Sequence, residues 1–340
     1  MKKAIWKGFL FLVLIGTILT ALEPLFIYKI EHRAKLRQGL YTSDGDYDVV
    51  MIGSSHMNGG LDPNVLWNQY GITSFNYATG GQPFDVSYYL LKEVLKKHKN
   101  PIVVMDVYYL GLTNSYGETG FISNVLDNMK FSANKLDAIV NCTPPDEWVS
   151  YLFPFLKYHF RWSSLEAKDL NYGETSIAYK KGFDAGTTRY GKDDASLAQT
   201  SDRAGIPPKT LSYLNKIIAL SKTDHFKLVL INFPCDYTDS NHQDGWVGDC
   251  EAMFNTVGDI AKENGIPFLD CDDKMDEIGI DFKQDMNNSG HLNIWGAVKV
   301  STYFGNYLKQ NFNLTDHRSD SAYAQWNSDY KLSQAASVPQ

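Results

Sequence analysis

The chain has 340 residues, of which 44% are hydrophobic and 21% are charged, which is ordinary for a globular protein with a large buried core. Its formal net charge is −7, and no basic face is evident that would neutralise phosphates, so the composition argues against nucleic acid as a partner. Some of this acidity lies in loops and in the tail, so it does not identify a substrate.

The first 28 residues predict a membrane anchor. Lysines at the start precede an uncharged apolar run, Gly8 to Leu22, and apolar residues continue past Glu23 to Tyr28. The run reaches the length of a membrane span if Glu23 lies near the far interface. A cleaved signal peptide is the alternative, but no clear small-x-small site follows the run, so a retained helix is favoured. The lysines place the amino terminus in the cytoplasm and the rest of the chain outside the cell.

Residues 29–47 are charged and contain glycine, which predicts a membrane-proximal linker. The next stretch, Val49 to Gly60, reads VVMIGSSHMNGG. An apolar run that breaks at a glycine predicts a buried parallel strand feeding a tight turn. A serine on such a turn lies at the carboxyl edge of the sheet, where α/β folds bind ligands. Ser55 is therefore a candidate nucleophile, although a polar turn that caps the next helix would have the same sequence.

The following segments alternate between strand and helix patterns. Strands are predicted over Ser74–Tyr77 and Pro101–Val107, with a helix over Phe84–Lys97 between them. After a long interruption, strands return at Phe226–Phe233 and Ile266–Leu269. This alternation indicates a parallel sheet with right-handed crossovers. We predict a three-layer α/β/α domain over residues 48–312 with a flavodoxin-like, five-stranded parallel sheet, preceded by one transmembrane helix.

The interruption, about residues 110–204, is predicted to be an insertion with one or two helices near Ser123–Val140 and an aromatic segment, Trp148–Trp162. We expect most of these rings to pack the insertion onto the sheet. The alternatives are a surface for stacking on sugars or a lid, with Arg161 as a candidate for an anionic group. After the domain, residues 313–340 are polar and low in aliphatic residues, which predicts a partly disordered tail.

A candidate base lies far along the chain, in the stretch DMNNSGHLNIWG from Asp285 to Gly296. His291 precedes an amphipathic helix predicted over Ile294–Leu308. A hydroxyl nucleophile needs a base within hydrogen-bond reach, and that base needs a third group to fix its tautomer. Asn288 lies three residues before His291, so one loop can carry both. Asp285 is the alternative third residue.

Four blocks, GSSH, NYATGGQP, VVMDVYYLG and GHLNIWGA, resemble the ordered sequence blocks of the SGNH, or GDSL-like, hydrolases. The resemblance is closest to their membrane-anchored branch, which includes the lipoteichoic-acid D-alanylation protein DltD and the alginate O-acetylation proteins. It implies the SGNH hydrolase fold, Ser55 as nucleophile and His291 as base. It also implies that the N–H of Gly80 or Gly81 helps to form the oxyanion hole, with Gln82 as a neighbouring substrate-side residue.

Two positions depart from the family pattern. Many members carry an aspartate three residues before the histidine, where this chain has Asn288. The asparagine of the third block is also missing, and Asp106 stands near its place. An ionised aspartate cannot donate a hydrogen bond to an oxyanion. The third triad member and the side-chain oxyanion donor are therefore both open.

The resemblance implies a membrane-anchored, extracytoplasmic serine esterase or O-acyltransferase. Such an enzyme would act through an acyl-serine on a cell-envelope polysaccharide or teichoic-acid-like polymer, with a membrane-bound O-acyltransferase as partner. The alternatives are a carbohydrate esterase with the same residues and a catalytically idle polysaccharide-binding subunit. No cofactor or metal is expected, because no histidine or cysteine spacing completes a transition-metal site. Disulfides and free buried thiols both remain possible for the four cysteines.

Overall fold

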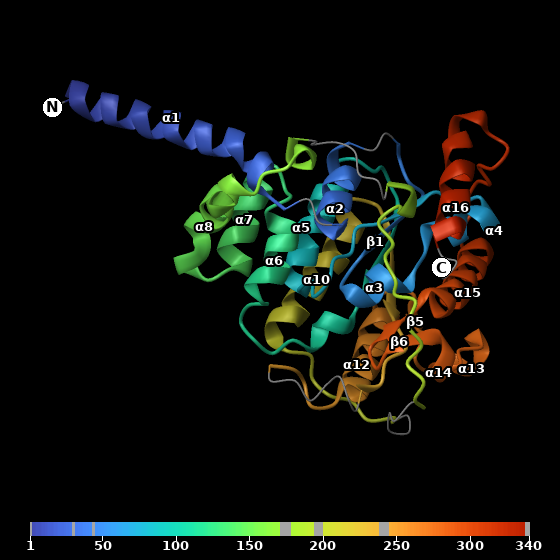
Figure 1. Ribbon diagram of the computed structural model, residues 1–340. Helices are drawn as coiled ribbons and strands as arrows, with labels where there is room; N and C mark the ends of the chain where they lie inside the picture. The colour runs from blue at the N-terminus through green and yellow to red at the C-terminus, as the bar shows by residue number, and fades with distance from the viewer. Residues whose placement is uncertain are drawn as a thin grey trace.

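The computed structural model describes residues 2–28, 31–42, 45–170, 178–193, 200–237 and 245–336. At its centre is a five-stranded sheet in the order β2-β1-β3-β4-β5, with every neighbouring pair parallel (Figure 1). The strands are β1 (Val49–Ile52), β2 (Ser74–Asn76), β3 (Ile102–Asp106), β4 (Lys227–Asn232) and β5 (Phe268–Asp270). This is the strand order of flavodoxin-like sheets. The predicted fold class, the parallel sheet and the number of strands are confirmed.

Side chains of the sheet alternate between two cores, as the two-residue period of a strand requires. Val50 and Ile52 of β1 belong to one core, and Val49 and Met51 belong to the other. The first core is covered by α5 (Phe84–Val94), α10 (Pro208–Thr223) and α12 (Cys250–Glu263). The second is covered by α4 (Pro63–Tyr70) and α15 (Ile294–Asn311). The sheet is thus buried on both faces, which explains why its strands are continuously apolar.

Several short elements lie beyond the carboxyl ends of the strands. Helix α3 (Ser55–Gly60) begins directly after β1, and η1 (Tyr108–Gly111) follows β3. Two short helices, α13 (Met275–Ile278) and α14 (Phe282–Asp285), lead into an antiparallel hairpin of β6 (Met286–Asn288) and β7 (His291–Leu292). The hairpin runs into α15, so the two candidate catalytic stretches both reach this edge.

The insertion adds a layer of helices rather than strands. Its described elements are α6 (Thr119–Leu126), α7 (Ala133–Cys142), η2 (Pro145–Glu147), α8 (Trp148–Leu152), α9 (Phe155–Tyr158), η3 (His159–Ser163), η4 (Ala167–Leu170) and η5 (Ala178–Lys180). Helices α6 and α7 pack on α5. The predicted insertion also covers residues 171–177 and 194–199, which lie outside the described residues.

The predicted linker differs from the structure. Most of it forms α2 (Glu31–Tyr41), which buries Leu36 and Leu40 in the first core. These two leucines lie one helical turn apart, which gives an otherwise charged helix one apolar stripe. The Lys35 ammonium is buried as well and donates to Asn58 Oδ1 and to the Gly182 carbonyl oxygen. Helix α2 is therefore packed on the domain.

The described part of the tail, which the composition predicts to be partly disordered, contains a helix. Helix α16 (Ala324–Ala336) packs on α4, and its Trp326 lies 5.2 Å from Trp67 between ring centroids. Asp329 of the same helix is ion-paired with Lys181. One large aromatic side chain buries enough area to fix a helix that is otherwise poor in aliphatic residues. Residues 337–340 lie outside the described part of the chain.

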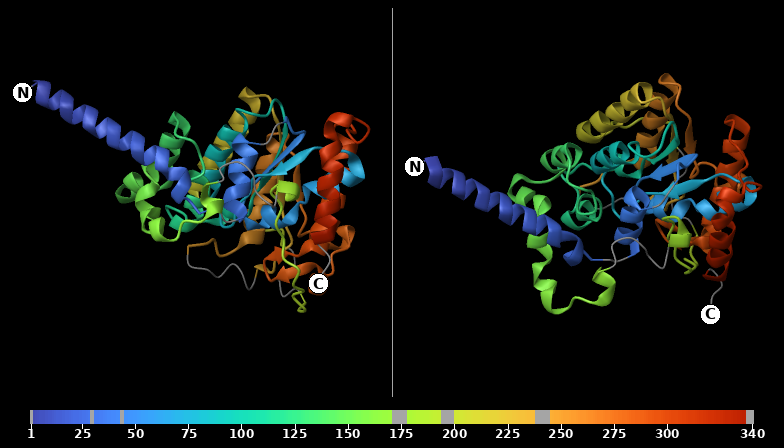
Figure 2. Two further views of the ribbon diagram at one scale, coloured as in Figure 1. Left: turned by 45° about the horizontal axis from the view of Figure 1, so that its top comes forward. Right: turned by 90° about the horizontal axis from the view of Figure 1, so that it is seen from above.

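Helix α1 (Lys2–Phe26) is long and apolar enough to cross a membrane. It extends away from the domain in all three views, and only its last turns meet the insertion (Figures 1 and 2). An apolar helix at this place fits either a membrane anchor or a signal sequence. The four cysteines, for which disulfides were an open alternative, are all buried, and no two of them form a disulfide.

Candidate active site

The turn that carries Ser55 is built by the close approach of two strand ends. Gly53 follows β1, and a Cβ atom at this position would overlap the side chain of Asp106 at the end of β3. Ser54 then caps α3, accepting a hydrogen bond from the His56 N–H at 3.3 Å. Ser55 is the first residue of α3, so its backbone N–H lies at a helix start where amide groups lack partners within the helix. Only glycine before the cap allows this geometry.

Asp106 holds this turn in place. It is buried, and its carboxylate accepts the Ser54 N–H at 3.0 Å, the Ser54 hydroxyl at 2.6 Å and the Tyr108 N–H at 2.9 Å. Burial raises the pKa of Asp106, and the hydrogen bond from the Ser54 hydroxyl is the largest effect that opposes the rise. Asp106, which the sequence placed near the oxyanion site, therefore uses its carboxylate oxygens to accept hydrogen bonds from the turn that carries Ser55.

His291 and Asn288 face each other across the β6–β7 hairpin, where they form a cross-strand pair. Asn288 Oδ1 lies 2.9 Å from His291 Nδ1, and His291 Nε2 lies 2.8 Å from Ser55 Oγ. The connecting turn is held by a bond from the Asp236 N–H to the Ser289 carbonyl oxygen. The structure therefore brings together three of the residues named from the sequence, in the order Ser55, His291, Asn288.

One further contact determines the tautomer of His291. The Gly290 N–H donates to Asn288 Oδ1 at 2.9 Å, so the side-chain atom that faces His291 is the amide oxygen and not the amide nitrogen. An oxygen only accepts, so Nδ1 of the neutral imidazole carries the proton. Its Nε2 then has a free lone pair directed at the Ser55 hydroxyl. This is the tautomer that a general base requires.

The second candidate for the third position, Asp285, has other partners. Its carboxylate is ion-paired with Lys299 at 2.5 Å and accepts the Asp281 N–H at 2.7 Å. It thereby supports the start of the hairpin, while Asn288 contacts the imidazole. Asn288 lies three residues before His291, so a two-residue turn places the two side chains opposite each other. This explains why Asn288 and not Asp285 contacts the imidazole.

A second imidazole, overlooked in the sequence, borders the site. His56 is buried, stacks on Tyr108 with ring centroids 3.8 Å apart, and lies 4.9 Å from the His291 ring. Its Nδ1 has no hydrogen-bond partner among the described residues. Burial lowers the pKa of His56 well below its usual value, and the neighbouring His291 lowers it further. Burial also lowers the pKa of His291, so both rings are neutral at neutral pH.

The predicted oxyanion loop lies beside the nucleophile turn. The Thr79 N–H donates to the Gly53 carbonyl oxygen at 3.3 Å. Gly81 has a φ of +64°, and a Cβ atom there would overlap the Phe121 ring, whereas Gly80 has open space around it. The buried Gln82 amide bonds to the Thr79 hydroxyl at 3.0 Å and to the Ser87 hydroxyl at 2.8 Å. Gln82 thus fixes the shape of this loop through its own side chain.

The end of the insertion connects the two catalytic stretches, which nothing in the sequence indicated. Asp184 and Asn58 of α3 exchange two hydrogen bonds of 3.0 Å. A few residues later, the Thr188 N–H donates to the Asn287 side chain and the Tyr190 N–H donates to the Met286 carbonyl oxygen. The segment therefore ties the nucleophile helix to the histidine hairpin and helps to set the distance between Ser55 and His291.

Arg161, considered above for an anionic group, has a different position. It is buried, pairs with Asp169 at 2.9 Å, donates to the Phe26 carbonyl oxygen at 2.5 Å and stacks on Tyr28 at 4.1 Å. The aromatic segment around it packs against the end of α1, for example through the Phe26–Phe155 ring pair. The expectation that these rings pack the insertion onto the sheet thus needs correction: much of this segment meets α1.

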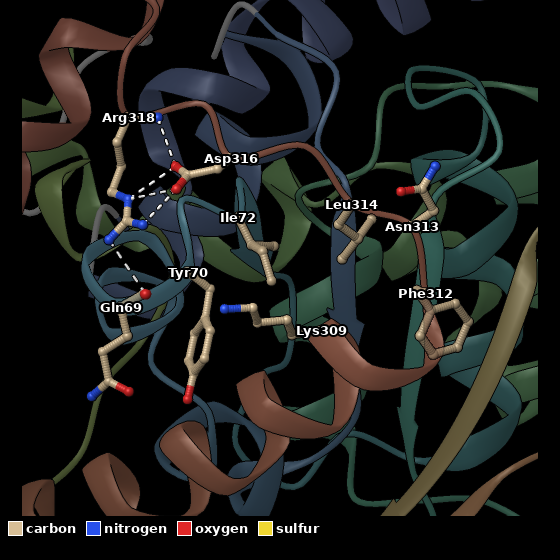
Figure 3. Close-up of a pocket in the computed structure, with 9 residues that line it drawn as sticks. All are labelled: Gln69, Tyr70, Ile72, Lys309, Phe312, Asn313, Leu314, Asp316 and Arg318. Atoms are coloured by element: carbon tan, nitrogen blue, oxygen red, sulfur yellow. Dashed lines mark hydrogen bonds and ion pairs between the residues drawn. The ribbon is translucent and has the colours of Figure 1, made fainter.

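A cavity of about 320 Å³ lies away from the triad, between α4 and the segment after α15 (Figure 3). Lys309 reaches into it, and Arg318 at its rim is bonded to Asp316. None of the predicted site residues lines it. Within the described ranges, no group of three or more histidine, cysteine, aspartate or glutamate residues is placed to hold a metal ion.

No family model and no curated protein matches this chain. Among solved structures, it is similar to a protein from Bacteroides fragilis NCTC 9343 assigned as an acylhydrolase, with 12% identity, a TM-score of 0.40 and coverage of 82% of this chain and 95% of the other. It is also similar to a Streptococcus pneumoniae protein assigned as a platelet activating factor, with 12% identity, a TM-score of 0.41 and coverage of 82% and 91%. Likenesses this distant carry no argument about activity, which rests on the geometry of Ser55, His291 and Asn288.

Proposed function

We propose that this chain is a membrane-anchored serine esterase or O-acyltransferase of the SGNH, or GDSL-like, type. The observation that carries the proposal is the hydrogen-bond chain from Gly290 through Asn288 and His291 to Ser55. It presents a hydroxyl to a neutral imidazole in the tautomer that accepts its proton. A cap or surface histidine would not need a partner on each ring nitrogen.

In the proposed reaction, Ser55 Oγ attacks the carbonyl carbon of an ester while its proton passes to His291 Nε2. The N–H of Ser55 and that of Gly80 or Gly81 stabilise the oxyanion, each contribution being about 3–4 kcal/mol in other enzymes. His291 then protonates the leaving alkoxide, and the acyl group remains on Ser55. Water or a sugar hydroxyl then attacks this acyl-serine and gives its proton to His291 Nε2. The bond between the acyl carbon and Ser55 Oγ breaks, and His291 returns the proton to Oγ.

Asn288 makes this site electrostatically weaker than one with aspartate. Its amide oxygen orients the imidazole but carries no charge to stabilise the imidazolium that forms during the reaction. A catalytically idle subunit that only binds polymer is therefore the alternative that this residue favours. The intact contact between His291 and Ser55 supports the enzyme, because a binding subunit gains nothing from that bond.

The substrate we propose is an O-acylated polymer of the cell envelope, either a polysaccharide or a teichoic-acid-like chain. The apolar α1 with lysines at its start supports a cytoplasmic amino terminus and a domain outside the membrane. The resemblance to the D-alanylation and alginate O-acetylation proteins supports transfer over hydrolysis, with a membrane-bound O-acyltransferase as the partner that delivers the acyl group. No cofactor takes part in this scheme.

A fluorophosphonate probe tests the proposal on the purified full chain. The wild type should be labelled at Ser55, and His291→Gln should label far more slowly because the base is lost. A fully folded wild type that does not label, while a known serine esterase labels in parallel, would leave the idle subunit as the answer.

Product analysis then separates transfer from hydrolysis. The chain is incubated with O-acetylated and D-alanylated oligosaccharides, with and without an unmodified oligosaccharide as acceptor. Mass spectrometry that finds the acyl group on the acceptor indicates transfer, whereas free acid alone indicates a carbohydrate esterase with the same residues.

A further inference from the structure

The described surface of the domain has an uneven distribution of apolar side chains. Outside α1, ten large hydrophobic side chains are exposed among the described residues, and eight of them lie between Phe131 and Leu170. Five of the eight lie on or close to the elements that meet α1, and we call them the apolar collar: Val149, Leu156, Phe160, Trp162 and Leu170. Trp162 is 73% exposed, which is costly for an indole surrounded by water.

Four of the five collar residues lie on elements that contact α1: Leu156 on α9, Phe160 and Trp162 on η3, and Leu170 on η4. Elements α9, η3 and η4 all contact α1, and Phe155 packs edge-on against Phe26 with centroids 4.8 Å apart. Contact begins further back, where the Phe153 ring lies 3.8 Å from the position of a Cβ atom on Gly16. In Figure 1 this region and α8 lie at the end of the domain from which α1 extends.

The length of α1 decides at which depth these contacts lie. The uncharged run Gly8–Leu22 has 15 residues and is about 22 Å long, whereas the hydrocarbon core of a bilayer is about 30 Å thick. A span that starts after Lys7 therefore ends near Tyr28, and the segment from Gly16 to Tyr28 crosses the outer half of the bilayer. This is the segment that the insertion packs against.

The polar residues of this junction are consistent with that depth. The Glu23 carboxylate of α1 lies 3.7 Å from the ammonium of the buried Lys135, and Arg161 forms a buried ion pair with Asp169. The charges that face α1 are thus paired within the protein. The exposed side chains of this region include the apolar collar together with polar residues such as His159 and Glu166. A surface of this kind, continuous with a spanning helix and rich in aromatic residues, is typical of an element that lies in the membrane interface.

We propose that the apolar collar is inserted in the outer leaflet of the bilayer, so that the domain is seated on lipid as well as tethered by α1. This inference rests on the membrane-anchored location proposed above. The uncharged run of α1 before Glu23 is shorter than the hydrocarbon core, and the collar adds apolar surface at the depth where that run has ended. It also fixes the orientation of the domain, because two attachments that lie side by side prevent free rotation about a single helix.

Spin labels on the full chain test the proposal. The chain is reconstituted in vesicles of phosphatidylglycerol and phosphatidylethanolamine, with one cysteine introduced at a time by Trp162→Cys, Phe160→Cys or Leu332→Cys. Leu332 is a matched control, an exposed apolar residue (53%) on α16, and Leu12→Cys in α1 is the control for lipid. The four native thiols are buried, so the unmodified chain provides the background signal. Collision with oxygen reports lipid, and collision with a water-soluble nickel chelate reports water.

We expect the ratio of oxygen to nickel accessibility at positions 160 and 162 to be several-fold higher than at 332 and to approach the ratio at 12. A lipid-like ratio at 12 with a water-like ratio at 160 and 162 would overturn the collar and leave the anchor standing. Low accessibility to both reagents at positions 160 and 162 would show that protein, such as a second copy of this chain, covers the collar. That result would also overturn the proposal that the collar lies in lipid. A water-like ratio at 12 would overturn the anchor and the collar together.

Discussion

At the carboxyl edge of the sheet, the side chains around Ser55 are polar and joined by hydrogen bonds, whereas those around the end of α1 are mostly aromatic and aliphatic. The first region combines two short stretches, the turn after β1 and the β6–β7 hairpin, each with its residues close together in sequence. The second joins α1 to an insertion more than 100 residues away, for example through Arg161 and Phe26. In Figure 1, α3 and β6 lie away from the end of the domain from which α1 extends.

This difference indicates that one region serves the chemistry and the other serves the stability of the fold. In the proposed reaction the polar region transfers a proton, so substitutions of Ser55, His291 or Asn288 should change turnover without unfolding the protein. The region around α1 holds the insertion to the rest of the chain, and substitutions there should change stability while the folded fraction keeps its chemistry. The following variants test this separation.

Ser55→Ala should have the largest effect. Removing the nucleophile is expected to lower ester turnover by about 10⁴-fold or more, since loss of a triad serine leaves only binding and the oxyanion site. The free energy of unfolding should change by less than about 0.5 kcal/mol, as for substitutions that touch no structural feature. Turnover of a chromogenic ester and denaturant unfolding measure the two quantities.

Ser54→Ala is the matched control, one residue away and with a structural role through Asp106. It should keep measurable turnover and lose stability instead. Equal turnover by the wild type and Ser55→Ala would remove the proposed chemistry altogether.

Arg161→Ala should have the next largest effect, which is a decrease in the free energy of unfolding. Breaking a buried ion pair by removing one partner costs about 3–5 kcal/mol, because Asp169 is left buried without its cation. Chemical unfolding of the full chain in detergent measures it. Arg203→Ala is the control, since Arg203 forms an exposed pair with Asp259 and its loss should change little. A stability loss no greater than that of the control would show that Arg161 does not hold the insertion to α1.

Asn288→Ala should lower turnover by roughly one to two orders of magnitude, less than the full contribution of a general base, which is about 10²–10⁴-fold. The imidazole keeps its place beside Ser55 but loses the group that fixes its tautomer. Asp285→Asn is the comparison. It should leave turnover within a few-fold of the wild type, because Asp285 contacts Lys299 and not His291. The reverse order of these two effects would reassign the third residue to Asp285.

Asn288→Asp should have the smallest effect, a shift in pH dependence. His291 acts only when neutral, so activity falls as the pH drops through its pKa. Burial lowers this pKa in the wild type, which places the fall below about pH 6.5, the ordinary histidine value. A carboxylate at position 288 favours the imidazolium, so the low-pH limb should move up by about one pH unit. The pH dependence of kcat/KM between pH 4 and 9 measures it, and an unmoved limb would mean that residue 288 does not contact the base.

Features with a short-range cause could be predicted from the sequence. The strands followed from apolar runs between breaks, and α1 followed from its length and uncharged composition. Asn288 and His291 are three residues apart and meet across one tight turn, so their pairing needed only local geometry. Ser55 was indicated by the glycine that ends β1.

Other features depended on contacts between distant parts of the chain, and only the tertiary structure decided them. Which of Asn288 and Asp285 contacts His291 depends in part on Lys299, which lies on another element and pairs with the Asp285 carboxylate. The residues after α1 form helix α2 because Leu36 and Leu40 pack in the first core, and the tail forms helix α16 because Trp326 packs on Trp67. Periodicity and composition report how a segment folds by itself, whereas burial and charge pairing depend on which partner the folded chain brings within reach.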